Sequence, residues 1–278
     1  MTGEQARRLE DWKVELHISH SQISSYLNCS LKYYFSYVEG RLPEQRPAPL
    51  AFGSAIHAAI GRYYKSLKQA GKPEPLSLLE DVFRDYWAFE SEDSGIPMVY
   101  KDGSNRESML QDGIRLVKTF YEGVKLINVV AVEEPLSAPL YDEQGNQTDL
   151  RLIGIVDCIQ RDEQGTLIII DHKTANRAYT QDKVEQDMQM TAYSYLVCAN
   201  KLVPPKAETF HRFDVLVKNK KEPRLEFYPT KRTAAQRKRL AKVINRVLKG
   251  IEAGVFFPSP SWMCSDCQYA KTCLNWSA

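Results

Sequence analysis

The chain has 278 residues, of which 43% are hydrophobic, enough for the core of one large domain or two small ones. Its formal net charge of +2 is too small to indicate nucleic-acid binding, so such an argument depends on where charges cluster. No segment approaches the roughly 18 apolar residues of a membrane span and the N-terminus lacks an apolar signal core, so we expect a globular cytoplasmic protein without membrane contact.

The first part of the chain, residues 20–125, shows a mainly helical pattern. Apolar residues recur at three- and four-residue spacing in 19–40 and again in 52–71, around a proline-rich turn. A charged, glycine-containing stretch at 91–105 predicts a loop, and 108–126 returns to the helical spacing. This region therefore predicts helices rather than a sheet.

The pattern then changes to segments rich in β-branched residues, separated by the turn-forming sequences DEQGNQT and RDEQG. This change predicts an antiparallel meander of three strands, then a helix, a further strand and a basic helix. The predicted elements are strands at 127–141, 149–162 and 166–174, a helix at about 181–199, a strand at 208–218 and a helix at about 231–252.

Two acids mark the second and third predicted strands. Asp157 lies among apolar neighbours, and Asp171 ends the following strand, so antiparallel pairing brings the two carboxylates close. Carboxylates crowded on an apolar sheet repel each other and lose solvation unless a cation lies between them. Mg²⁺ suits this position because it binds a few carboxylate oxygens, keeps several waters and binds substrate phosphate.

Lys173 projects from the same face as Asp171, because side chains alternate along a strand. A lysine there can orient a metal-activated water and neutralise charge that develops on phosphate. An acid and a lysine two residues apart are alone typical of a solvated strand end, but Asp157 favours a catalytic site. Gln189 and Tyr193 lie four residues apart on the next helix, hence on one face, where they could bind a phosphate or a base or form a buried polar pair.

The segments GIVD, IIIDHKT and QMTAY occur in this order. They resemble motifs II and III and the Gln-x-x-x-Tyr motif of the RecB-type branch of the PD-(D/E)xK nuclease superfamily. Upstream, ISHSQISSYLNCSLKYYFSYVEG is similar to the N-terminal segment of that branch, and FGSAIHAAI is similar to the helix that carries its metal-binding histidine.

This resemblance implies a set of site residues. His57, Asp157 and Asp171 would bind the catalytic Mg²⁺ or Mn²⁺, with the backbone carbonyl of His172 as a further ligand. Lys173 would be the catalytic lysine, and Gln189 and Tyr193 would belong to the same site. Considered without the family, His57 is a lone histidine on an apolar helix, typical of a core residue. Glu133 and Glu134 on the first predicted strand are candidates for supporting the metal ligands.

Three cysteines near the C-terminus, Cys264, Cys267 and Cys273, form a C-x₂-C-x₅-C cluster, and three thiolates need a fourth ligand. The resemblance implies Cys29 as that ligand and a structural [4Fe-4S] cluster, because relatives carry one N-terminal and three C-terminal cysteines. The residues alone leave Zn²⁺ equally open. Serine follows Cys29 where relatives often have proline. Two further cysteines occupy apolar contexts and are expected to be buried: Cys158 and Cys198.

Basic residues gather between Glu226 and Glu252, an interval without acids. Four of them form a stripe at helical spacing beside an apolar stripe, so one face can pack while the other meets phosphates: Arg239, Lys242, Arg246 and Lys249. Residues 217–224 add a second basic cluster. Aromatic residues of the N-terminal helix are expected mainly in the core and around the cysteines, although stacking on single-stranded bases is a second use.

These observations predict an α/β protein with a restriction-endonuclease-like core. The core is a mixed sheet in the order helix–strand–strand–strand–helix–strand, with an N-terminal helical region and a C-terminal cysteine cluster. We expect one nuclease domain over 1–278, with a helical part at 20–125, a catalytic core at 127–218 and a basic helix and cluster region at 230–278.

The predicted function is a DNA exonuclease acting on single strands or DNA ends. The resemblance implies a role in DNA repair, recombination or CRISPR adaptation, beside a helicase or a CRISPR integrase. The alternative is a non-catalytic DNA-binding or scaffold module in which the cysteines hold zinc.

Overall fold

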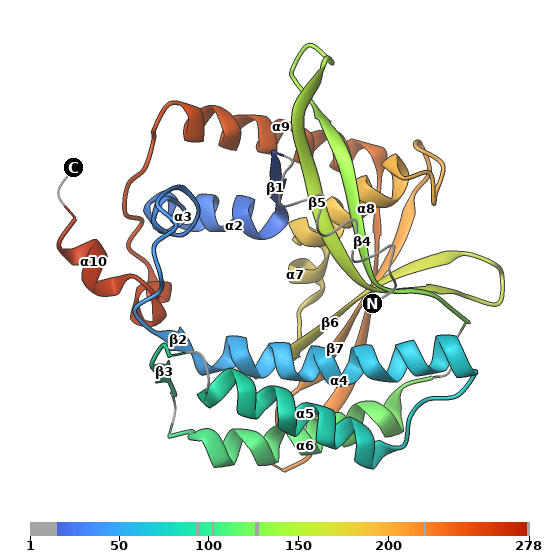
Figure 1. Ribbon diagram of the computed structural model, residues 1–278. Helices are drawn as coiled ribbons and strands as arrows, with labels where there is room; N and C mark the ends of the chain where they lie inside the picture. The colour runs from blue at the N-terminus through green and yellow to red at the C-terminus, as the bar shows by residue number, and fades with distance from the viewer. Residues whose placement is uncertain (1–15, 93–94, 102, 126–127, 220, 277–278) are drawn as a thin grey trace.

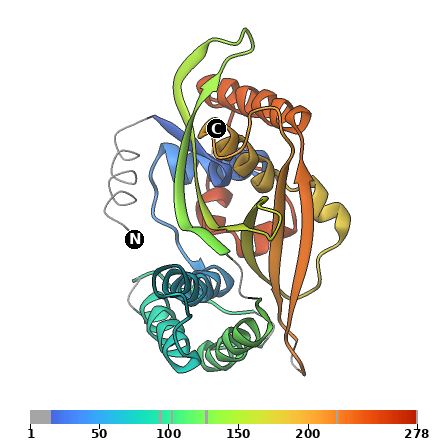
Figure 2. The ribbon, with the colours of Figure 1, turned by 90° about the vertical axis from the view of Figure 1, so that its right-hand side faces the viewer.

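A six-stranded mixed sheet separates two groups of helices (Figures 1 and 2). The strand order is β1-β5-β6-β7-β8, and β4 pairs with β5. The strands are β1 His17–Ser19, β4 Asn128–Tyr141, β5 Gln147–Arg161, β6 Leu167–Ala175, β7 Thr209–Val217 and β8 Arg224–Arg232. The computed structural model describes residues 16–92, 95–101, 103–125, 128–219 and 221–276.

The predicted meander is confirmed, because β4 pairs antiparallel with β5 and β5 with β6. Its two turns use the same chemistry. The side chain of Asp142 accepts hydrogen bonds from the backbone N–H groups two and four residues further on, and Asp162 does the same in the second turn. The glycine of each turn, Gly145 or Gly165, has a φ of 90° or 84°, a conformation that glycine adopts without steric cost.

Three helices cover one face of the sheet and share an apolar core with it (Figure 1). They are α4 Ala48–Ala70, α5 Leu76–Glu92 and α6 Arg106–Gly123. The sequence predicted α4 and α6 but not α5, whose buried residues Leu79, Phe83 and Trp87 form a narrow stripe at four-residue spacing among charged neighbours. Two short strands, β2 Arg46–Pro47 and β3 Met98–Val99, pair parallel beside this layer.

A second group of helices packs on the opposite face around a separate apolar core. It contains α2 His20–Asn28, α7 Gln181–Gln186, α8 Met188–Ala199 and α9 Ala234–Glu252. The prediction of one helix over 181–199 is wrong, because the chain turns at Asp187. This residue has φ −64° and ψ 122°, and its side chain accepts the N–H of Met190 as the N-cap of α8.

The predicted basic helix begins three residues later than 231. Thr233 and Gln236 form a capping box at the start of α9, and residues 224–232 form β8 instead, antiparallel to β7. The sequence analysis did not predict this strand, because its apolar alternation is weak and it contains Pro229. Proline is tolerated here because β8 is an edge strand.

Segments from the two ends of the described chain lie side by side (Figure 1). The N–H of Leu31 donates to the carbonyl of Phe257 over 3.1 Å, and the hydroxyl of Tyr269 donates to the carbonyl of Arg41 over 3.0 Å. The elements concerned are α3 Ser30–Tyr33, the π-helical turn η1 Tyr34–Val38, the 3₁₀ turn η2 Trp262–Asp266 and α10 Ala270–Leu274. Within the described residues, no helix has the length and apolar character needed to cross a membrane.

Candidate active site

The site begins where β5 and β6 part. These strands pair only between 158–161 and 167–170, after which β6 continues beside β7. Asp157 and Asp171 stand next to the last pair, at the fork, and the N–H of His172 donates to Asp157 Oδ2 over 2.8 Å. The two acids that the sequence singled out are therefore brought together by the divergence of their strands.

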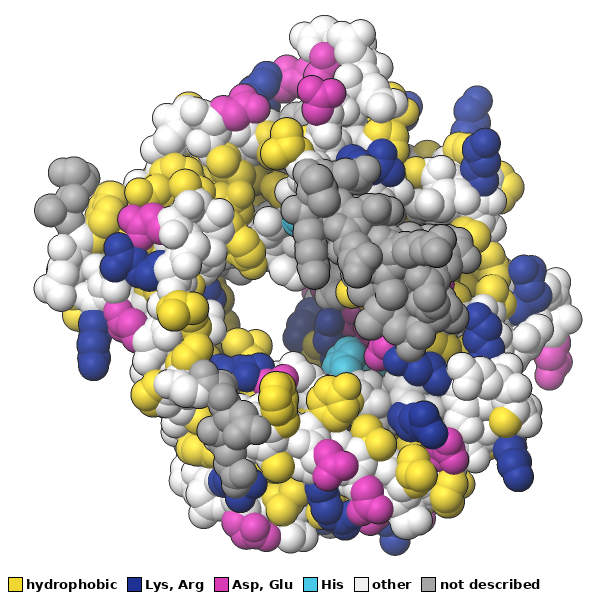
Figure 3. All heavy atoms as spheres, viewed as in Figure 1, with side chains coloured by type: hydrophobic (Ala, Val, Ile, Leu, Met, Phe, Trp, Pro, Cys, Tyr) yellow, Lys and Arg dark blue, Asp and Glu magenta, His cyan; other side chains and the backbone are white. Residues whose placement is uncertain are grey.

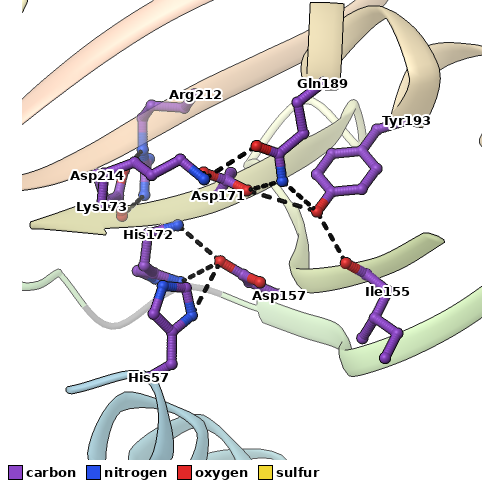
Figure 4. Close-up of polar contacts among 10 residues, drawn as sticks. All are labelled: His57, Ile155, Asp157, Asp171, His172, Lys173, Gln189, Tyr193, Arg212 and Asp214. Carbon is purple, nitrogen blue, oxygen red and sulfur yellow. Dashed lines mark hydrogen bonds and ion pairs between the residues drawn. The ribbon is translucent and has the colours of Figure 1, made fainter. Parts of the chain in front are cut away.

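Asp171 is held in a closed polar network (Figure 4). Its Oδ2 lies 2.7 Å from Nζ of Lys173, and its Oδ1 accepts Nε2 of Gln189 over 2.9 Å. Lys173 also donates to Oε1 of Gln189 over 2.9 Å. Gln189 donates further to the hydroxyl of Tyr193, which itself donates to the carbonyl of Ile155. The strand pair and helix α8 thus fix the carboxylate and the ammonium relative to each other.

Asp157 forms the second half of the site with α4 (Figure 4). His57 Nδ1 lies 3.4 Å from Asp157 Oδ2. The ring of His172 is buried beneath, 3.6 Å from the same oxygen and against the ring of Tyr64. His57 reaches the site because α4 packs against β4 and β6.

The surroundings shift the pKa values of the two aspartates in opposite directions. Burial raises the pKa of Asp171, and the neighbouring Asp157 carboxylate raises it further against the lowering effect of Lys173. Burial also acts to raise the pKa of Asp157, but His57 and the hydrogen bond from His172 outweigh it and lower that pKa. Burial tends to lower the pKa of Lys173, yet Asp171 raises it. Lys173 therefore remains a cation and a hydrogen-bond donor, not a base.

The site opens into a pocket of about 520 Å³ lined by His57, Glu133, Lys173 and Thr174, called the site pocket below. The exposed side-chain fraction rises from 1% for Asp171 to 29% for Lys173 and 38% for His57. Asp171 therefore lies at the bottom of the site, and the lysine and histidine are the groups that a bound molecule meets first.

The donor set fits a hard divalent cation. Asp157 and Asp171 supply carboxylate oxygens and His57 an imidazole, which Mg²⁺ and Mn²⁺ accept. In the described part of the chain, no three His, Cys, Asp or Glu side chains are grouped to hold a metal ion by themselves. An ion that uses one or two carboxylates and keeps several waters does not need such a group.

Glu133, a candidate for supporting the metal ligands, lies beside the site, and so does His20, which the sequence analysis did not single out. Glu133 stands opposite Asp157 between two regular pairs of β4 and β5, has a φ of 47° and forms an ion pair with Lys65. His20, the first residue of α2, lies near Asp187 and Lys173, whose charges act on it in opposite directions, although burial is the main cause of its lowered pKa. The start of α2 has a sequence signal in the capping box of Ser19 and Gln22, but no local pattern shows that His20 lies near Lys173 or that the backbone of Glu133 is left-handed.

The four cysteines of the proposed cluster gather where the two chain ends meet. Cys29, Cys267 and Cys273 pack against the small apolar cluster of Leu31, Phe35 and Tyr269. Burial raises the pKa of the Cys273 thiol, and the charges of Cys29, Cys264 and Cys267 raise it further. These thiols are therefore neighbours, although they do not form a closed ligand set in the described residues. Cys158 and Cys198 are buried elsewhere, as predicted.

The basic residues between Glu226 and Glu252 differ in their surroundings. Arg232 and Arg237 are buried, at 0% and 6% exposure, and donate to hydroxyl and carbonyl groups of α7, α8 and β8, so these two cannot contact DNA. Arg246 and Lys249 form ion pairs with Glu143 at the tip of the β4–β5 hairpin. Arg239 and Lys242 border an apolar groove beside Tyr26 of α2.

Comparison with known proteins agrees with this geometry. Residues 17–274 match the family model of the PD-(D/E)XK nuclease superfamily. A crystal structure of a candidate exonuclease from Eubacterium rectale aligns with 97% of this chain and 92% of its own, with a TM-score of 0.54 and 12% identity. At that identity the likeness concerns the fold. A crystal structure of the protein SSO0001 covers 89% of this chain and 95% of its own, at 14% identity and a TM-score of 0.38, too low to support an argument. No curated protein matches the sequence.

The predicted fold class is thereby confirmed. A mixed sheet with helices on both faces, and acids at the fork of two strands, is consistent with a restriction-endonuclease-like core. The family match extends from β1 to α10 and so includes the whole polar network around Asp157, Asp171 and Lys173. The chain belongs to the PD-(D/E)XK nuclease superfamily.

Proposed function

We propose that the protein is a divalent-metal-dependent deoxyribonuclease that degrades single-stranded DNA or DNA ends as an exonuclease. The observation that carries the proposal is the convergence of Asp157 and Asp171 at the fork of β5 and β6. Nζ of Lys173 lies 2.7 Å from Oδ2 of Asp171 at the same place. Two acids of like charge, Asp171 buried and Asp157 half-buried, are costly in an apolar sheet unless a cation joins them.

Asp157 and Asp171 would hold Mg²⁺ or Mn²⁺, with His57 and the carbonyl of His172 completing the protein ligands. Such an ion polarises a phosphate and favours ionisation of the attacking water. Lys173 contributes a cation held by Asp171 and Gln189, and it stabilises negative charge as this develops on the phosphate oxygens. Tyr193 keeps Gln189 in place.

The shape of the molecule supports a single-stranded substrate. Figure 3 shows an opening through the described part of the chain, with basic side chains and a histidine at its margin. In Figure 1 the same region lies between α2, α4 and α7. A flexible single strand can pass such an opening, whereas a stiff duplex is a poorer fit. A strand can enter an opening that protein surrounds on all sides only by a free end, which favours exonuclease action.

Cleavage assays on end-labelled single- and double-stranded DNA test the proposal. With Mg²⁺ or Mn²⁺ the protein should shorten the single strand, and Asp171→Asn and Lys173→Met should each reduce the rate by at least about 100-fold. Asp149→Asn, an exposed acid on the same strand β5, is the matched control and should cut at the wild-type rate. A wild-type protein that cuts neither substrate with either metal would refute the proposal and favour a DNA-binding or scaffold module.

We also propose that Cys29, Cys264, Cys267 and Cys273 hold a structural [4Fe-4S] cluster that joins the two ends of the chain, with zinc as the alternative ion. Anaerobically purified protein should then be brown, with an absorption band at about 400 nm. Cys273→Ser should lose that band, whereas Cys198→Ser, a buried cysteine outside the group, should keep it. Colourless protein with bound zinc would contradict the iron cluster.

The biological role proposed from the RecB-type resemblance is DNA processing in repair, recombination or CRISPR adaptation, beside a helicase or a CRISPR integrase. The sequence motifs that support this role are those of the nuclease core. Pull-down of such a partner with the intact protein, in the presence of DNA, tests the assignment.

A further inference from the structure

A second cavity, of about 320 Å³, lies next to the site pocket, and Pro49 lines both. We call it the carboxyl-end cavity, because residues that follow two strand ends form part of its wall. Side chains from α4, α6 and the ends of β6 and β7 surround it, among them Pro49, Arg115, Leu116, Asn176 and Lys218.

The position of this cavity follows from the sheet topology. β6 and β7 are parallel neighbours, and Asn176 and Lys218 come directly after them. The N–H of Lys218 donates to the carbonyl of Ala175 over 2.7 Å, so the two strand ends stay together beneath the cavity. In sheets with parallel strands, the crevice beyond the carboxyl ends is the usual place for a ligand.

The charge of the cavity is positive. Lys101, Arg115 and Lys218 line it, against the single acid Asp112. Arg115 forms an ion pair with Asp112, and Lys101 forms one with Asp266. Lys218 differs from both, since no carboxylate of the described residues lies within ion-pair distance and its Nζ lies 4.0 Å from the centroid of the Phe52 ring.

A half-buried ammonium held against an aromatic face is stabilised less well than one paired with a carboxylate. Burial is the main cause of the lowered pKa of Lys218, and the charge of Asp112, which is paired with Arg115, offsets the effect of burial only in part. An anionic group that entered the cavity would supply the missing partner.

The rest of the wall combines apolar and polar side chains. Met109 and Leu116 are buried at 6% and 1% exposure and form an apolar side together with Pro49 and Pro223. Asn176 offers an amide that can donate and accept hydrogen bonds. A nucleotide combines these features, because its base needs apolar walls and polar edge contacts and its phosphate needs a cation.

We propose that the carboxyl-end cavity binds one nucleotide of the DNA strand, adjacent to the phosphate in the site pocket. The base lies against Met109 and Leu116, and the phosphate meets Lys218. This inference rests on the proposed nuclease function, since it places the nucleotide beside the bond that is cut. The cavity then fixes the register of the strand relative to Asp171 and Lys173.

Calorimetric titration of thymidine 5′-monophosphate into wild-type protein in EDTA tests the cavity without any cleavage. The mononucleotide should bind about tenfold tighter than thymidine or inorganic phosphate alone, because only the nucleotide uses both parts of the cavity. Lys218→Gln should weaken its binding by about tenfold or more, the value expected for loss of one charge-assisted contact.

Lys118→Gln is the matched control, because Lys118 is a 58% exposed lysine of α6 whose nearest acid, Glu122, lies 3.8 Å away. It should bind the mononucleotide as wild type does. Circular dichroism should show that both variants are folded. The cavity proposal fails if the mononucleotide does not bind, if Lys218→Gln binds it as wild type does, or if inorganic phosphate binds equally well.

The two proposals fail in different ways. Absence of cleavage with intact mononucleotide binding would remove the nuclease assignment and leave the cavity in place. Normal cleavage with mononucleotide binding insensitive to Lys218→Gln would remove the cavity and leave the nuclease. Initial-rate measurements on a labelled single strand should further show that Lys218→Gln raises KM, because the strand loses a contact that it makes before the bond is cut.

Discussion

Gln189 organises the candidate site at the scale of single residues. Its amide oxygen accepts Lys173, and its amide nitrogen donates to both Asp171 and Tyr193. An amide can play this double part because it carries a donor and an acceptor at fixed geometry, which a carboxylate or an ammonium cannot do. The Gln–Tyr pair of the sequence is therefore hydrogen-bonded to the acid and the lysine of the candidate site.

Replacement of Tyr193 separates positioning from stability. Tyr193→Phe removes the hydrogen bond to the carbonyl of Ile155 (2.8 Å) and the contact that holds Gln189. We expect the free energy of unfolding to fall by about 1 kcal/mol and the cleavage rate to fall about tenfold. Denaturant unfolding and the single-strand assay measure the two effects.

Tyr195→Phe is the control for this prediction. Tyr195 lies on the same helix and donates to the carbonyl of Pro139 over 2.7 Å, whereas none of its hydrogen bonds in the described residues goes to the site network. It should lose a similar free energy of unfolding and keep the wild-type cleavage rate. Equal losses of activity in both variants would show that Tyr193 acts only through stability.

At the scale of elements, the fork between β5 and β6 creates the site. β5 pairs with β4 along most of its length. β6 pairs with β5 only as far as residue 170 but remains paired with β7 beyond it. Polar side chains at the fork face space that a continuous sheet would close, and α4 and α8 approach from opposite faces to supply His57 and Gln189. The helices must therefore pack closely on the sheet and on each other.

Close packing of α5 and α6 depends on Gly113. A Cβ at this position would meet Cζ of Phe83 at 1.8 Å, and Phe83 is fully buried, so the ring cannot move aside. Gly113→Ala should lower the free energy of unfolding by about 3 kcal/mol through overpacking. Denaturant unfolding with a fluorescence or circular dichroism signal measures the change.

Gly123→Ala, in the same helix, serves as the comparison. Its Cβ would meet Leu225 at 3.4 Å, an ordinary contact. Gly123 is the last residue of α6, so the preference of alanine over glycine, about 1 kcal/mol in a helix interior, contributes less here. This variant should be as stable as the wild type or slightly more so. A large loss for Gly123→Ala, or none for Gly113→Ala, would contradict the packing described here.

At the scale of the whole molecule, polar contacts join the N-terminal and C-terminal segments of the described chain. Glu44 accepts the N–H groups of Lys271 and Thr272 at the start of α10, and the hydroxyl of Thr272. Hydrogen bonding from the Thr272 side chain is the main cause of the lowered pKa of Glu44. This carboxylate therefore holds the C-terminal segment against the N-terminal one.

Removal of that carboxylate should loosen the C-terminal segment. Glu44→Ala should increase amide hydrogen exchange in 270–274 at neutral pH. In the wild type the protection of these amides, measured against the exchange of an unstructured peptide at the same pH, should fall as pH falls below the ordinary glutamate value of 4.5, because a lowered folded pKa stabilises only while the group is ionised. Exchange read by mass spectrometry measures both effects.

Glu39→Ala provides the control, since Glu39 forms its ion pair with Arg41 within the same N-terminal segment. It should leave exchange in 270–274 unchanged. Unaltered exchange in Glu44→Ala would mean that the cysteine region alone holds the two ends together.

The sequence by itself determined the local part of this structure. The change from helical to strand spacing, the two DEQG turns and the order Asp157, Asp171, Lys173, Gln189, Tyr193 are local patterns, because backbone geometry depends on near neighbours. They predicted the meander, the core order and the membership in a nuclease superfamily. Narrow or interrupted patterns, as in α5 and β8, gave too weak a signal.

The tertiary structure decided which residues meet. The fork of β5 and β6, the approach of His57 and the burial of Arg232 and Arg237 depend on packing between distant segments. Residue type does not show whether a charge faces water, since both arginines carry the same charge as the exposed ones. The carboxyl-end cavity likewise exists only where α4, α6 and two strand ends come together, since packing between distant segments forms it.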